Sequence, residues 1–258
     1  MKDLIFKILY QKRMLLLWWF LALAAIMGLT MSFFPAFRGN GLGDSFANLP
    51  AGVQKIVGDS LSFTTISGYV QQQVFALRAP VLIIILSIVV FGGQVAGEEQ
   101  KGVTETHLSL PVSRTKLLLS KLVAGMTITL LATLGIIVGI ELALFFINES
   151  YSFAKIVQST LAAWLVGLIF GLLSYAVGAA SGHKAPSIGM PSALAFLTYL
   201  ISSMAASVSW LKPLNKLTPF YYYDNGLITA AHALGLAAVC VLLVVIGTIG
   251  FNHRDLRT

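Results

Sequence analysis

The chain has 258 residues, of which 57% are hydrophobic and 10% are charged. Soluble domains average about 45–50% apolar and about 25% charged residues, so this composition excludes an ordinary water-soluble globule. The formal net charge is +7. In so apolar a chain, this charge favours flanks that face anionic lipid over a nucleic-acid surface, and no nucleic-acid partner is expected. The single cysteine, Cys240, excludes a disulfide within the chain.

Six apolar stretches are long enough to cross a membrane, because a helix needs about 20 mainly apolar residues to span the hydrocarbon. They lie near residues 14–34, 80–97, 122–147, 156–180, 187–210 and 227–251. Together they occupy more than half of the chain, and no remaining segment is large enough for a separate soluble domain. The sequence therefore predicts an all-α, polytopic membrane protein, with one transmembrane domain over 1–258 built as a six-transmembrane-helix bundle.

Lys and Arg are distributed unevenly between the two sides that six spans define. The segments on the side of the two termini hold 11 Lys and Arg in 50 residues, whereas the opposite segments hold 6 in 69. Lys and Arg accumulate in cytoplasmic loops. We therefore expect the N- and C-termini to be cytoplasmic.

Two segments outside the spans have recognisable patterns. In residues 1–13, one helical stripe is apolar and four Lys and Arg lie around it, as in a helix at the membrane interface. A simple positively charged anchor is an equal alternative. Residues 35–79 form a predicted outer loop. A loop of this length usually has a function, although covering the bundle is a sufficient structural role.

The predicted cytoplasmic loop 98–121 mixes charged side chains with an apolar centre. Its charged residues are Glu98, Glu99, Lys101, Glu105, Arg114, Lys116 and Lys121, and its apolar centre is Leu108, Leu110 and Val112. This mixture is typical of a docking surface, in which apolar anchors supply binding energy and the charged rim supplies specificity. Pro111 ends any preceding helix, and Ser113 is placed to cap the next one near Arg114. A solvated linker is the alternative interpretation.

The same loop carries a resemblance to a known family. The run Glu99-x-x-Gly102-x-x-Glu105-x-x-Leu108-Ser-Leu-Pro-Val-Ser-Arg114 resembles the loop between the second and third spans in permease subunits of type-2 ATP-binding-cassette (ABC) exporters. The tail Phe251-Asn-His-Arg254-Asp255-Leu256 and the N-terminal Leu9-Tyr-x-x-Arg13 are also similar to family motifs. Val103 departs from the pattern, since many members have Thr there.

The resemblance implies a transport subunit that works with a separate ATPase. In the family this loop is the coupling helix that contacts the nucleotide-binding subunit. The implied contact residues are Glu98, Glu99, Gly102, Glu105, Leu108, Leu110, Pro111, Val112 and Arg114. It also implies a second permease copy or a homologous permease, surrounding membrane lipids, and a bacterial or archaeal plasma membrane. Drugs, antibiotics and peptides are among the substrates that the family exports.

The chain has no phosphate-binding loop of the Gly-x-x-x-x-Gly-Lys-Ser/Thr type, and the dipeptide Gly-Lys does not occur. We therefore expect no enzyme activity, no catalytic residue and no cofactor in this chain. ATP and Mg are expected in the partner ATPase subunit. The four histidines are scattered, and their spacing predicts no metal site.

Several residues inside or beside the spans have two interpretations. Gly135-x-x-x-Gly139 and Gly167-x-x-x-Gly171 allow close helix approach, and packing within one protomer is favoured over a dimer interface. Glu141 is the only acidic residue well inside a predicted span, so it is a candidate pathway residue. The alternative interpretation is that Glu141 has access to water or pairs with a basic neighbour. The aromatic run 220–223 favours a belt at the membrane boundary over a substrate gate.

Two other functions remain as alternatives. An ion-coupled secondary transporter needs a coupling site near the midplane, for which the chain offers only the off-centre Glu141. An intramembrane peptidase is the second alternative, because Glu98-Glu99 is similar to the paired glutamates of the prenyl-protein peptidase family. That motif needs Arg at the position of Val103, and no Gly-x-Ser-x-Gly nucleophile turn occurs.

Overall fold

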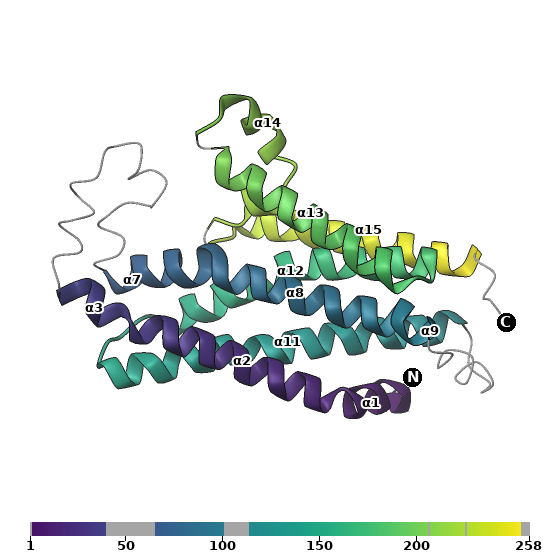
Figure 1. Cartoon of the computed structure of the whole chain (residues 1–258), viewed down its shortest axis with the longest axis horizontal. Helices are drawn as coiled ribbons and strands as arrows, with labels where there is room; N and C mark the ends of the chain where they lie inside the picture. The colour runs from purple at the N-terminus through teal and green to yellow at the C-terminus, as the bar shows by residue number, and fades with distance from the viewer. Residues whose placement is uncertain (1, 40–64, 101–113, 206, 225, 254–258) are drawn as a thin grey trace.

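The computed structural model describes residues 2–39, 65–100, 114–205, 207–224 and 226–253. Regular structure in these residues is helical, and the long helices lie roughly side by side (Figure 1). Six helical runs are long and apolar enough to cross a membrane: Arg13–Ala36, Ile66–Gln100, Thr115–Ile147, Phe153–Ser181, Lys184–Met204 and Ala230–His253. The predicted all-α class and the six spans are therefore confirmed.

The N-terminal part consists of α1 (Lys2–Gln11), α2 (Arg13–Ser32) and α3 (Phe34–Gly39). The apolar stripe of α1 faces α11 (Arg114–Ile147), so that Ile8 is buried and Leu9 packs against the core. Phe6 on another face is 72% exposed. Residues 1–13 are thus mostly helical, and their placement at the membrane interface stays a prediction.

The second span begins earlier than the sequence predicts. It runs without interruption through α7 (Ile66–Tyr69), the π-helix η1 (Val70–Arg78), α8 (Ala79–Gly92), the π-helix η2 (Gly93–Gly97) and α9 (Glu98–Gln100). The predicted start near residue 80 is wrong for the helix, and the two ends of the predicted outer loop 35–79 are helical. Polar residues at 71–73 and Arg78 end the apolar stretch, but polar side chains do not end a helix.

The remaining spans are α11, α12 (Phe153–Ser181), α13 (Lys184–Met204) and α15 (Ala230–His253). The start of α11 agrees with the helix predicted to begin near Arg114. Gly182 ends α12 in a left-handed conformation, with φ of 69°. Three short helices connect α13 to α15: η3 (Ser209–Leu211), α14 (Lys212–Asn215) and η4 (Pro219–Tyr222).

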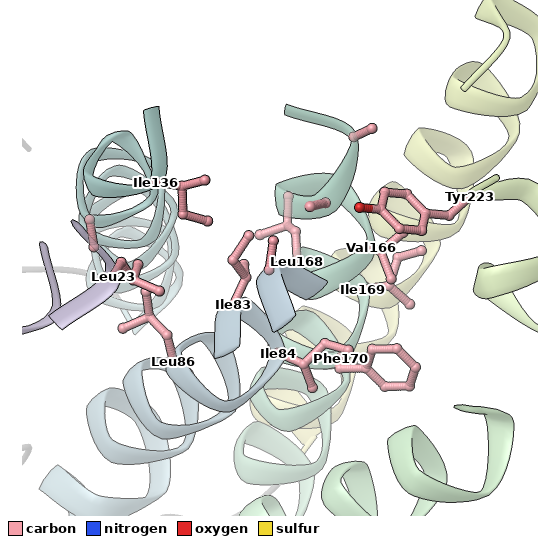
Figure 2. Close-up of a cluster of buried hydrophobic side chains, with 14 of the residues drawn as sticks. Leu23, Ile83, Ile84, Leu86, Ile136, Val166, Leu168, Ile169, Phe170 and Tyr223 are labelled. Carbon is pink, nitrogen blue, oxygen red and sulfur yellow. The ribbon is translucent and has the colours of Figure 1, made fainter. Parts of the chain in front are cut away.

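The helix α12 lies at the centre of the bundle, because it packs against α8, α11, α13 and α15. The buried core is formed by apolar side chains of α2, α8, α11 and α12. Figure 2 shows part of this core, with Ile83 of α8 between Ile136 of α11 and Leu168 of α12. By contrast, α2, α13 and α15 expose most of their apolar side chains, as expected of helices at the edge of a bundle in lipid.

The predicted glycine motifs are contact points between helices of the same chain. A Cβ atom on Gly135 or Gly139 would lie 2.3 Å from a backbone carbonyl oxygen of α2, that of Phe20 or Ala24. On α12, a Cβ on Gly167 would meet the Ile83 side chain at 2.5 Å. Only glycine permits these approaches. Packing within one protomer, the favoured interpretation, is therefore confirmed for both motifs.

We predict that Gly139→Ala lowers the stability of the protein in detergent by about 1–3 kcal/mol, because the added methyl group must push α2 away from α11. Gly189→Ala is the matched control, since a Cβ there has nothing within 4 Å. The melting temperatures of both variants are measured by circular dichroism. Equal melting temperatures would show that the contact between α2 and α11 is not close.

Candidate functional site

The described parts of the predicted coupling segment, α9 and the start of α11, lie at the end of the bundle where α1 begins and α15 ends. In Figure 1, α1, α9 and the C-terminal end of α15 all lie at this end, and α3, α7 and α14 lie at the other. Of the predicted contact residues, Glu98, Glu99 and Arg114 belong to the described ranges. The others, Gly102, Glu105, Leu108, Leu110, Pro111 and Val112, lie outside the described residues, and so does Ser113.

An ion cluster fixes Glu98 between three elements. One carboxylate oxygen lies 3.0 Å from Nζ of Lys121 on α11, and the other lies 3.7 Å from Nζ of Lys12 at the junction of α1 and α2. The Lys121 side chain is only 5% exposed. A buried ammonium group without a partner is costly, so this pair holds α9 against α11. Lys12 is only partly buried, and its longer ion pair contributes less.

Glu99 is also turned toward the protein. One of its carboxylate oxygens is enclosed, and its side chain lines a small pocket with Val95, Lys121 and Phe251. Phe251 is the first residue of the C-terminal motif and is buried. The tail of the chain is therefore packed directly beside the beginning of the coupling segment.

The three motifs that carry the family resemblance meet at this end of the bundle. In the N-terminal motif, the Arg13 guanidinium lies 4.0 Å from the centre of the Tyr10 ring, and α1 contacts α11. In the C-terminal motif, Asn252 is hydrogen-bonded to Thr115 of α11 at 3.5 Å. Segments from the beginning, middle and end of the sequence thus surround the helix ends on either side of residues 101–113.

Sequence analysis missed a buried polar residue close to this cluster. Gln94 lies in the π-helix η2 and is 1% exposed, and neither atom of its amide has a hydrogen-bond partner among the described residues. Its oxygen lies close to Gly125 of α11. An unpaired buried amide is costly, and π-helical turns are frequent at functional sites. The sequence does contain a signal for this residue, because Gln94 is a polar side chain between Gly93 and Gly97 in an apolar stretch.

Glu141 lies on α11 toward the end of the bundle away from the termini. It is half-buried, and one of its carboxylate oxygens is enclosed without a hydrogen-bond partner in the described ranges. It makes no ion pair with a described residue, so the basic neighbour of the alternative interpretation is not found there. Groups of three or more His, Cys, Asp or Glu able to hold a metal ion are likewise not found in the described part of the chain.

The aromatic run at residues 220–223 is partly buried in the protein, and its placement at the membrane boundary stays a prediction. Phe220 is buried against Phe170 and Tyr199, and Tyr223 is buried with its hydroxyl group donating to the Phe75 carbonyl at 2.8 Å. Burial raises the pKa of Tyr223 above its ordinary value, so the hydroxyl group remains a donor. Two of the four rings therefore anchor the connection between α13 and α15: Phe220 packs against α12 and α13, and Tyr223 is bonded to η1.

The comparison with protein families agrees with this arrangement. The sequence matches the family described as ABC-2 family transporter protein over residues 7–256, which is nearly the whole chain. The chain belongs to the ABC-2 transporter family. The resemblance inferred from the three motifs is thereby confirmed. No curated protein matches the sequence.

Membership in the ABC-2 family makes the chain a permease, a membrane transport domain without a nucleotide-binding site of its own. The six apolar helical runs agree with a multi-pass membrane protein. The convergence of the three motifs at one end identifies the region around α9 and the start of α11 as the candidate functional site of this ABC-2 permease. Within it, the ion pair of Glu98 and Lys121 holds α9 to α11.

We predict that Glu98→Gln destabilises the permease by about 1.5–3 kcal/mol, because Lys121 stays buried without its carboxylate. The double variant Glu98→Gln, Lys121→Met is expected to recover part of this loss, since it removes the buried charge as well. Lys12→Met serves as the control and should cost less than about 1 kcal/mol. The stability of all three variants is measured by thermal melting in detergent. Equal losses for Glu98→Gln and Lys12→Met would contradict the assignment.

Proposed function

We propose that the chain is the permease subunit of an ATP-driven exporter, coupled through residues 98–121 to a separate ATPase subunit. The observation that carries this proposal is the convergence of Glu98, Lys121, Lys12 and Phe251 around the helix ends that border the segment. The ABC-2 family match supports it. Since the sequence lacks a phosphate-binding loop, ATP and Mg belong to the partner.

The ion cluster gives this coupling a physical route. A partner that pushes on residues 101–113 moves α9 on one side and the start of α11 on the other. Because Glu98 is paired with both Lys121 and Lys12, such a movement reaches α8, α11 and the junction of α1 and α2 together. ATP binding shifts the permease between two conformations only if the ATPase contacts them differently.

The proposal also includes orientation and surroundings. The Lys and Arg distribution supports cytoplasmic termini, and this places the coupling segment on the side where ATP is available. We propose a bacterial or archaeal plasma membrane as the location and a second permease, identical or homologous, as the other half of the pathway. The proposed cargo is a drug, an antibiotic or a peptide.

Coupling is tested by the double variant Glu99→Lys, Glu105→Lys. We predict that it abolishes co-purification with the partner ATPase subunit, because charge reversal opposes the polar contacts proposed for these two residues. Glu149→Lys, at the opposite end of α11, is the control and should leave co-purification unchanged. Both variants must melt like the wild type in detergent. Unchanged association of a correctly folded double variant would overturn the coupling role.

Glu141 is proposed as a pathway residue that contacts a cationic part of the cargo. An antibiotic panel first identifies a compound to which the wild-type complex gives resistance. We predict that Glu141→Gln then reduces this resistance about tenfold, because a hydrogen bond to a charged group contributes about 1.5–3 kcal/mol. Glu149→Gln is the matched control. Full resistance with Glu141→Gln would remove Glu141 from the pathway.

A further inference from the structure

A second site lies at the end of the bundle away from the termini. There, a pocket of about 620 Å³ opens between the end of α13, α14, η4 and the first residues of α12 and α15. Pockets that bind small molecules measure about 300–1,000 Å³, so its size suits a small organic ligand. Its wall is made mainly by the aromatic run and by residues 227–229, with Gln158, Ser202, Asn215, Asp224 and His232.

Three rings form one side of this pocket. The rings of Tyr221 and Tyr222 have centres 5.2 Å apart and planes at 89°. The ring of Tyr222 also meets that of His232, with centres 5.0 Å apart and planes at 70°. Successive rings thus lie nearly perpendicular to one another. The face of an aromatic ring carries negative potential, and rings in several orientations around one space are how proteins enclose organic ammonium groups.

The rings are held in place before any ligand arrives. The Tyr222 hydroxyl donates to the Lys216 carbonyl at 2.9 Å. The Tyr221 amide donates to the Thr218 side chain at 3.3 Å, which caps η4. The neighbouring Tyr223 is fixed through the Phe75 carbonyl. Binding to such a preformed wall loses little conformational entropy.

Asp224 supplies the charge. It is the one carboxylate among the described lining residues, and these include no Lys or Arg. Its backbone amide and carbonyl both bond to Leu227, at 3.2 and 2.8 Å, so the turn that carries it is fixed. Its side chain is exposed and makes no ion pair within the described ranges. A carboxylate beside perpendicular rings favours a cation and disfavours an anion.

We propose that this pocket binds an organic ammonium cation, with Asp224 as the counter-charge and the rings of Tyr221 and Tyr222 as the apolar wall. Trimethylammonium and protonated amine groups share this chemistry, and they occur both in free amines and in lipid headgroups. The proposal is independent of ATP coupling and of Glu141, because binding is measured on the purified permease alone.

Choline chloride is the probe, titrated calorimetrically into the permease in a neutral detergent at fixed ionic strength. We expect saturable binding of choline and at least tenfold weaker binding of 3,3-dimethyl-1-butanol, which has the same shape without the charge. Asp224→Asn and Tyr222→Leu should each weaken choline binding at least tenfold. The control Asp3→Asn, on α1 at the other end, should have no effect.

Asp224→Asn is expected to fold normally, because the side chain is exposed and the backbone makes the bonds of the turn. Tyr222→Phe keeps the ring and should weaken binding less than Tyr222→Leu. Equal binding of the neutral analogue, or choline binding that Asp224→Asn leaves unchanged, would overturn the proposal. Absence of choline binding at millimolar concentration would also overturn it.

The source of the ammonium group is found by repeating the titration in lipid nanodiscs. If choline binds more weakly in phosphatidylcholine than in phosphatidylglycerol discs, and the difference persists at an ionic strength that screens the lipid charge, the lipid headgroup occupies the pocket. If the affinities are equal, the ligand is a free amine. Both results support the cation site, and loss of binding in both kinds of disc contradicts it.

Discussion

In a bilayer, apolar side chains gain no hydrophobic energy by packing against one another instead of against lipid, so this bundle depends on the close approach of helix backbones at small residues. Gly135 and Gly139 bring α11 against the backbone of α2, and Gly167 and Gly171 bring α12 against α8. These contacts connect α2, α11, α12 and α8. The other helices complete the bundle by packing around α12.

This packing positions the charged end of the molecule. With α8 and α11 fixed, Glu98 at the end of one helical run lies beside Lys121 on the next, and the last turn of α15 brings Phe251 to the same place. The two ion pairs of Glu98 join α9 to α11 and to the junction of α1 and α2. Glu98 therefore serves to hold helices of the bundle together.

Hydropathy and local chemistry were enough to predict the six spans, the start of α11 near Arg114 and the use of the glycine motifs within one chain. They failed at residues 66–79, because polar side chains ended the apolar stretch while the backbone remained helical. The pairing of Glu98 with Lys12 and Lys121 and the edge-to-face contact of Tyr222 with His232 join residues of different helices. No local pattern reports such contacts, so tertiary structure was needed to find them.

The ion cluster also opposes movement of the bundle along the membrane normal. Lys12, Glu98 and Lys121 share one level along the helices, and drawing a single charged side chain to the centre of a bilayer costs about 2.5–3.5 kcal/mol or more. The cluster resists any sliding of α2, α8 or α11 toward the opposite leaflet. A movement of these helices along the membrane normal would therefore carry three charged side chains with it.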